Sequence, residues 1–176
     1  MASVVFLRGV NVGGHKTFRP SVLAKDLADY DVVNVGAAGT FVVRKPISQA
    51  KLRAELLRRL PFEPEIMICS EQDIIRLVSS DPFAGKPTGP DIVRFVSVLA
   101  KSSRALPALP LMLPADGDWL VKIVTVKSRY AFGMYRRNMK TIGFLSQVEK
   151  RLGVPATTRN WNTINAIVKV LKGHAK

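Results

Sequence analysis

The first eighty residues alternate short apolar runs with amphipathic segments, and this alternation restricts the fold more than any other feature of the chain. Four apolar runs have the length of β-strands, and they cover residues 3–7, 31–35, 40–43 and 65–69. Residues 20–30 and 48–60 instead repeat apolar side chains every three or four positions, as one face of a helix does. Ser70 and Asp73 then form a capping box that begins one more helix. The order β-α-β-β-α-β predicts a ferredoxin-like lobe, in which two interlocked β-α-β units share one antiparallel sheet.

Residues 81–90 form the clearest boundary in the chain, because they contain three prolines and two glycines. Beyond them, residues 92–99 predict a strand, and residues 119–126 and 129–135 predict a hairpin that turns at Lys127-Ser128. Two helices are expected to close the chain, the first with an apolar face at Ile142, Leu145, Val148 and Leu152. We therefore expect an α+β protein with three parts: a ferredoxin-like lobe at 1–80, a Pro/Gly-rich linker at 81–90, and a smaller, basic β-β-β-α-α lobe at 91–176.

Positive charge is concentrated towards the end of the chain. The formal net charge is +14, and residues 119–176 hold twelve Lys or Arg against one acidic residue, Glu149. Residues 1–118 hold fifteen basic and twelve acidic residues, so their net charge is only +3. This asymmetry suggests an anionic partner, which could be nucleic acid, a membrane surface or a phosphorylated ligand. The alternative is a well-solvated surface with no partner.

The sequence predicts a cytoplasmic protein without a membrane segment. The opening residues lack a basic n-region, and Arg8 interrupts the first apolar run too early for a signal peptide. No stretch approaches the eighteen apolar residues that a membrane span needs. A single cysteine, Cys69, cannot form an internal disulfide, which fits a reducing compartment.

Two segments carry a family resemblance: residues 6–14, which read FLRGVNVGG, and residues 152–163, which read LGVPATTRNWNT. Together they resemble the bacterial family known as domain of unknown function 1697, and Asp81-Pro82-Phe83 extends the match along the chain. The resemblance implies a compact α+β cytoplasmic protein whose first part is ferredoxin-like. It implies no activity, cofactor or partner. This chain departs from the family at Ala38-Gly39-Thr40, where members usually carry Ser-Gly-Asn, so most of the polar capacity of that turn is lost.

The glycine-rich loop after the first strand is one candidate anion site. Its glycines, among them Gly13 and Gly14, can take positive φ and expose backbone N–H groups between a strand and a helix. Arg8 adjoins them and is the expected ligand contact, together with Asn11. The loop has neither a Walker pattern nor a dinucleotide-binding fingerprint. The alternative is a tight connection in which Asn11 bonds to its own backbone.

A second candidate is the polar segment at 157–163, expected at the start of the last helix. It places six polar side chains around Trp161, more than helix capping requires. Arg159 could bind an anion through two N–H groups, with Asn160 as an orienting amide. The alternative makes Trp161 a core anchor that Arg159 covers.

The predicted hairpin and the residues after it are the third candidate, for nucleic acid. The cations expected to contact phosphates are Lys122, Lys127, Arg129, Arg136, Arg137 and Lys140. Tyr130, Phe132 and Tyr135 lie among them and could stack on bases. However, Tyr130, Phe132 and Met134 alternate as the buried face of a strand does, which makes core packing the alternative.

The leading hypothesis is a non-catalytic binding module for a polyanion such as nucleic acid, acting through the basic second lobe. The competing hypothesis is an enzyme or sensor for a small phosphorylated or carboxylated ligand, held between the lobes by the loop and Arg159. A plain protein-interaction domain is a third hypothesis.

A ferredoxin-like lobe with Phe6 and Phe41 on its strands also invites comparison with RNA-recognition domains, although their signature is absent. No catalytic constellation or metal-ligand spacing is visible, so no catalytic residue, metal or cofactor is expected. The sequence does not determine the oligomeric state.

Overall fold

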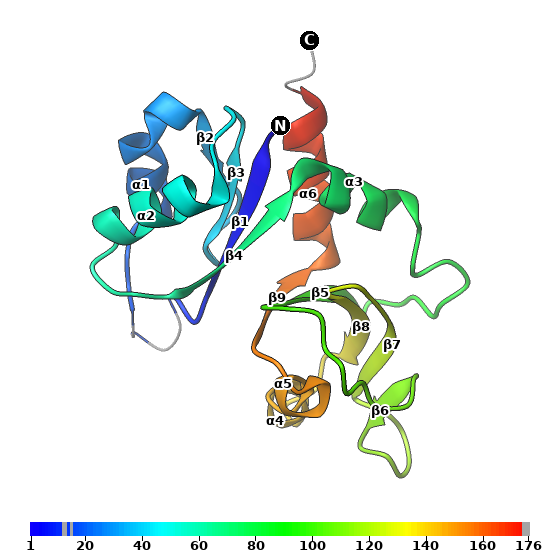
Figure 1. The fold of residues 1–176 in the computed structure, drawn as a ribbon. Coiled ribbons are helices and arrows are strands. Elements are labelled where there is room, and N and C mark those ends of the chain that lie inside the picture. The colour runs from blue at the N-terminus through cyan, green and yellow to red at the C-terminus, as the bar shows by residue number, and fades with distance from the viewer. Residues whose placement is uncertain (12–13, 15, 174–176) are drawn as a thin grey trace. The chain divides into compact units, whose positions relative to one another are not determined.

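The chain folds into two compact units, each built around one antiparallel sheet. The computed structural model describes residues 1–11, 14 and 16–173 (Figure 1). Unit 1 comprises Met1–Ser80 together with the chain from Asn162 onward, and unit 2 comprises Asp81–Trp161. Two antiparallel sheets accompanied by helices confirm the predicted α+β class.

The sheet of unit 1 contains four strands: β1 (Ser3–Arg8), β2 (Val32–Asn34), β3 (Thr40–Val43) and β4 (Glu65–Ser70). Their spatial order is β2-β3-β1-β4, and every neighbouring pair is antiparallel. Val5 on the central strand β1 lies opposite Phe41 on β3 and Ile68 on β4. All three side chains belong to the same buried cluster, because directly opposed residues share one face of a sheet.

Helices cover both faces of this sheet. They are α1 (Pro20–Asp26), followed by a 3₁₀ turn η1 (Ala28–Tyr30), α2 (Gln49–Arg59), α3 (Glu71–Ser79) and α6 (Trp161–Gly173). Figure 1 shows α1 and α2 on one face and α3 with α6 on the other. The side chains of Ser48 and Ser70 cap α2 and α3, accepting bonds from the backbone N–H groups of Lys51 at 3.2 Å and Asp73 at 3.1 Å.

Coverage on both faces explains why the strands of unit 1 read as unbroken apolar runs. Successive side chains of a strand point to opposite faces, so Val4 and Phe6 face away from Val5 and Leu7. All four are at most 1% exposed. Phe6 and Phe41 consequently lie on opposite faces, both buried, so they form no shared platform on which bases could stack.

The last helix packs with unit 1, whereas the sequence pattern assigned it to the second lobe. Its apolar face carries Ile164, Ile167, Val168 and Leu171, and all four are buried. The face of β1 that carries Val4 and Phe6 is buried, and α3, with only nine residues, is too short to cover it alone, so α6 covers the rest. None of the helices described reaches the length and apolar content that a bilayer crossing demands.

The sheet of unit 2 has five strands in the order β6-β7-β8-β5-β9. These are β5 (Ile92–Leu99), β6 (Leu111–Leu113), β7 (Val121–Lys127), β8 (Tyr130–Arg136) and β9 (Ala156–Asn160). The predicted hairpin is present as β7 and β8, and Ser128 in its turn has φ +54°. One face of the sheet packs against α4 (Thr141–Leu145) and α5 (Val148–Leu152), around a cluster that includes Phe95 and Ile123.

The structure corrects two expectations for unit 2. The single helix expected to carry Ile142 and Leu152 on one face is broken into α4 and α5, and Ile142 is 75% exposed. Ser146 follows α4 and donates its hydroxyl hydrogen to the carbonyl oxygen of Gly143 at 2.7 Å, which competes with continuation of the helix. The polar segment at 157–163 begins in strand β9, because its β-branched threonines suit an edge strand and pair with β5, and only its residues from Trp161 onward open helix α6 as expected.

Candidate functional site

The side chains predicted to bind an anion at the glycine-rich loop already have partners in the protein. Arg8 pairs with Glu65 across β1 and β4, with 3.2 Å between Nη1 and Oε1. Asn11 closes the loop: its Oδ1 accepts a hydrogen bond from the backbone N–H of Phe18 at 2.9 Å, and its Nδ2 donates to the carbonyl oxygen of Ala37 at 3.3 Å. Gly14 has φ +76°, as a nest would need, while Gly13 lies outside the described residues.

A loop-closing role for Asn11 predicts a loss of stability when its side chain is removed. Asn11→Ala is expected to lower the free energy of unfolding by about 1–2 kcal/mol, because two hydrogen bonds are lost. Urea unfolding followed by circular dichroism measures this change. Gln72→Ala is the control, since Gln72 is exposed on α3, and it should unfold at the wild-type midpoint. Equal stability of Asn11→Ala and Gln72→Ala would contradict the assigned role.

In the second predicted cluster, Thr157 and Arg159 are buried, whereas Thr158 and Asn160 are exposed. Arg159 is 6% exposed and donates from Nη1 to Oγ1 of Thr157 at 2.6 Å and to the carbonyl oxygen of Thr158 at 3.0 Å. Burial lowers the pKa of Arg159 to about 10, so its guanidinium remains charged at neutral pH. Trp161 packs edge-on against Phe83, with ring centroids 5.0 Å apart, and Asn160 is exposed at the end of β9. Trp161 therefore belongs to an aromatic cluster with Phe83 and Phe132.

The predicted nucleic-acid residues do not form one patch. Lys127 and Arg129 flank the β7–β8 turn, whereas Arg136, Arg137 and Lys140 lie where β8 ends or beyond it. Six residues of strand, 130–135, separate these two groups by roughly 20 Å. Two of the intervening rings, those of Tyr130 and Phe132, are 4% and 0% exposed and are part of the core.

At the far end, which we define as the end of the sheet where β5 begins and β8 ends, three cations have protein partners. Arg136 lies 4.3 Å over the ring of Trp119 and 3.5 Å from Oδ2 of Asp91. Lys122 also lies over Trp119, at 5.8 Å, and Nε of Arg137 donates to the carbonyl oxygen of Pro90 at 3.1 Å. These contacts within the protein account for the positions of the three side chains without a bound ligand.

The opposite end of the sheet of unit 2 contains a cavity. A concavity of about 690 Å³ is lined by Lys101, Ser102, Ser103, Arg104, Ala105, Gly153 and Val154. A second of about 430 Å³ shares two of these residues and is lined by Ser146, Glu149, Lys150, Gly153, Val154 and Pro155. We call the two together the basic groove. One wall is the loop after β5, and the other is α5 with the connection to β9.

Local contacts hold the two walls of the basic groove together. The backbone N–H of Ala100 donates to the carbonyl oxygen of Pro155 at 2.8 Å, and the hydroxyl of Ser103 donates to that of Leu152 at 2.6 Å. Gly153 turns the chain after α5 with φ +74°, a conformation that residues with a Cβ rarely adopt. Hydrogen bonds and the turn at Gly153 therefore fix the shape of the groove at this end of the sheet.

The basic groove collects cations that have no carboxylate partner. Lys101, Arg104 and Lys150 are exposed, and no ion pair involves any of them within residues 81–161, all of which the structure describes. Glu149 is the one carboxylate in the lining, and its Oε1 accepts a hydrogen bond from the backbone N–H of Ala156 at 2.7 Å. Lys127, Arg129 and Arg151 lie at the same end of the sheet, so the local charge is strongly positive.

Positive charge is shared more evenly between the two units than between the two segments of the sequence. Unit 2 holds thirteen basic and five acidic residues, for a net charge of +8, and unit 1 holds fourteen and eight, for +6. The two units are therefore more evenly charged than the two segments of sequence, because Lys169, Lys172 and Lys176 count towards unit 1. The stronger asymmetry lies inside unit 2, where Asp91, Asp116 and Asp118 adjoin strand ends at the far end.

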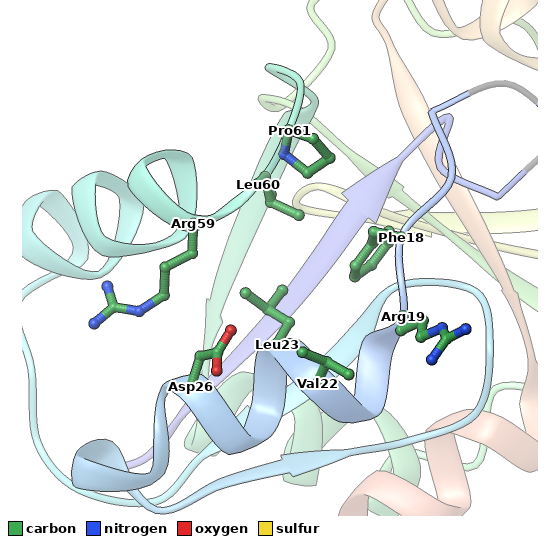
Figure 2. A pocket seen from close by; sticks show the side chains of 8 residues that line it. All are labelled: Phe18, Arg19, Val22, Leu23, Asp26, Arg59, Leu60 and Pro61. Atoms are coloured by element: carbon green, nitrogen blue, oxygen red, sulfur yellow. The ribbon is translucent and has the colours of Figure 1, made fainter.

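Unit 1 has a smaller cavity between α1 and the end of α2 (Figure 2). It measures about 220 Å³, and Phe18, Leu23 and Leu60 form its apolar centre. The guanidinium groups of Arg19 and Arg59 point outwards in Figure 2, and Nη1 of Arg59 donates to the carbonyl oxygen of Glu55 at 3.1 Å. Among the residues that the structure describes, no group of three or more His, Cys, Asp or Glu side chains is arranged to hold a metal ion.

Fold and groove together define a two-unit α+β protein with a cationic concavity. The sequence profile of the family described as protein of unknown function (DUF1697) matches residues 1–110, and the chain belongs to that family. No curated protein matches. Among solved structures, the chain is similar to a conserved bacterial protein from Streptococcus pneumoniae at 16% identity and a TM-score of 0.56. The likeness covers 97% of this chain and 98% of the other, and it shows a shared fold.

Proposed function

We propose that this protein is a non-catalytic binding module for a polyanion such as nucleic acid, and that the basic groove is its binding surface. One observation carries the proposal: exposed cations without carboxylate partners gather at the groove, while three of the five acidic residues of unit 2 adjoin the far end. Cations at a concave surface raise the local concentration of an anionic partner and release counterions when they contact phosphates. The proposal moves the interface from the hairpin to the groove.

A salt titration tests the proposal directly. A fluorescein-labelled 20-base-pair DNA duplex is titrated with the protein, and fluorescence anisotropy is measured at several salt concentrations between about 50 and 200 mM. If about six cations contact phosphates, the affinity should fall roughly a thousandfold over this range, with a log–log slope near −5. Absence of binding at the lowest salt concentration would overturn the proposal.

We also propose that unit 1 is a ferredoxin-like lobe and that the protein acts in the cytoplasm. The strand order β2-β3-β1-β4 with antiparallel neighbours supports the first point, since two interlocked β-α-β units give this order. α1 and α2, the helices of those two units, also lie together on one face (Figure 1). The single, buried cysteine supports a reducing compartment.

The alternative, an enzyme or sensor for a small phosphorylated or carboxylated ligand, stays a prediction. It requires Arg8 to exchange Glu65 for the ligand and Asn11 to give up the contacts that close its loop. Ligand binding there would have to break these existing contacts. The cations of the basic groove form no ion pair in unit 2 that a ligand would have to break. The polyanion proposal is therefore the better supported of the two.

A further inference from the structure

We infer that the basic groove binds a chain of phosphates through charge and hydrogen bonds alone, and that nucleobases make no contribution to its affinity. This inference rests on the proposed function and specifies its ligand. The ligand chemistry is a linear chain with one negative charge per phosphate. Nucleic acid of any sequence and inorganic polyphosphate both present this chemistry.

The position of every aromatic ring in unit 2 supports the inference. Residues 81–161 contain eight aromatic side chains, and the structure describes all of them. Four are at most 4% exposed: Phe83, Phe95, Tyr130 and Phe132. None of the eight lines the basic groove.

The other four rings are held elsewhere. Trp119 lies under Arg136 and Lys122 at the far end, and Trp161 packs against Phe83. Tyr135 and Phe144 pack against the apolar cluster between the sheet and its helices. A base entering the groove therefore has no ring on which to stack. One stacked base contributes roughly tenfold or more in affinity, so its absence is measurable.

The groups that do line the groove suit phosphate oxygens. Three cations, those of Lys101, Arg104 and Lys150, stand on its two walls. Ser102 adds an exposed hydroxyl next to Lys101, and hydroxyl and cationic groups are the usual contacts to a phosphate backbone. Ser103 holds the wall in place, since its hydroxyl donates to the carbonyl oxygen of Leu152. Such groups read charge and spacing and carry no sequence information.

Three probes of matched length test the inference with the full chain. They are a labelled dT 20-mer, an abasic strand with the same number of phosphates, and inorganic polyphosphate, which is used as an unlabelled competitor and is also titrated directly by isothermal titration calorimetry. We expect the two strands to bind within about threefold of each other, with salt slopes that differ by less than one. Polyphosphate should displace both at a similar concentration of phosphate.

The outcomes separate this inference from the proposed function. If the abasic strand binds tenfold or more weakly than the dT strand, bases contribute, so the inference is wrong while the proposed function stands. If no probe binds at about 50 mM salt, both are wrong. If polyphosphate binds and neither strand does, the phosphate-chain chemistry is supported and nucleic acid is excluded as its source. Binding of all three probes with equal salt slopes supports the inference in full.

Discussion

Gly133→Ala is expected to lower the free energy of unfolding by about 3 kcal/mol, because the central strand of unit 2 has no room for a methyl group. A Cβ at this position would lie 2.8 Å from the carbonyl oxygen of Lys122 and 2.8 Å from Cε2 of Phe95. Gly133 pairs with Ile123 on one side and Phe95 on the other, so neither neighbouring strand can withdraw without breaking the sheet. The ring of Phe95, which is 1% exposed, occupies the space above the glycine.

Chemical unfolding followed by near-ultraviolet circular dichroism measures this loss. Gly143→Ala is the matched control, because a Cβ there has nothing within 4 Å and the residue lies in α4. Alanine is the better helix former, so the control should be unchanged or more stable by up to about 1 kcal/mol. Adding Phe95→Leu to Gly133→Ala should restore part of the loss by removing the ring. Equal midpoints for wild type and Gly133→Ala would contradict the role of Phe95.

Local signals explain why the sequence predicted unit 1 so well. Ser48 and Ser70 cap their helices, and such caps depend on residues only three positions apart. The strands were also recognisable in the sequence, because burial on both faces makes each one a continuous apolar run. The sequence could not reveal that α6 supplies part of that burial. The helix lies more than eighty residues away from the strands it covers.

The failures in unit 2 come from contacts between distant segments. β9 contains two threonines, one arginine and one asparagine, and it became a strand only because the edge of β5, some sixty residues earlier, accepts it. Without β9, nothing in the sequence places Lys150 near Lys101 and Arg104. The basic groove was therefore missed, although Lys101-Ser102-Ser103-Arg104 is visible as a polar, basic loop after a strand. That loop was the one local signal of the site.

Charge counted along the sequence also does not show where cations gather in the folded protein, because distant segments come together in each unit. Counting along the sequence placed the positive excess in the last third, and this includes Lys169 and Lys172, which belong to unit 1. In the structure, what distinguishes the groove is its smaller number of neighbouring carboxylates: Glu149 is the one in the lining, whereas Asp91, Asp116 and Asp118 adjoin the far end. At the far end, Arg136 forms an ion pair with Asp91. A ligand that approaches unit 2 therefore meets a net field that is more positive at the groove.

The triple variant Lys101→Gln, Arg104→Gln, Lys150→Gln is expected to bind the 20-base-pair duplex at least a hundredfold more weakly at about 0.1 M salt. Each phosphate contact adds about 0.9 to the salt exponent, so three lost contacts should reduce the magnitude of the slope by about 2.7. The three side chains are exposed and have no partner in unit 2, so the variant should unfold at the wild-type denaturant concentration. Anisotropy titrations and urea unfolding measure the two quantities independently.

The matched control removes the same charge from the far end: Lys86→Gln, Arg137→Gln, Lys140→Gln. All three residues are exposed, so the control lowers the net charge of unit 2 from +8 to +5, as the groove variant does. It should retain affinity within about fivefold, because long-range attraction is screened beyond roughly 10 Å at this salt concentration. If both variants lose affinity equally, net charge alone attracts the duplex and the groove is not the site. If only the far-end variant loses affinity, the interface lies beyond β8, where the sequence had placed Arg137 and Lys140.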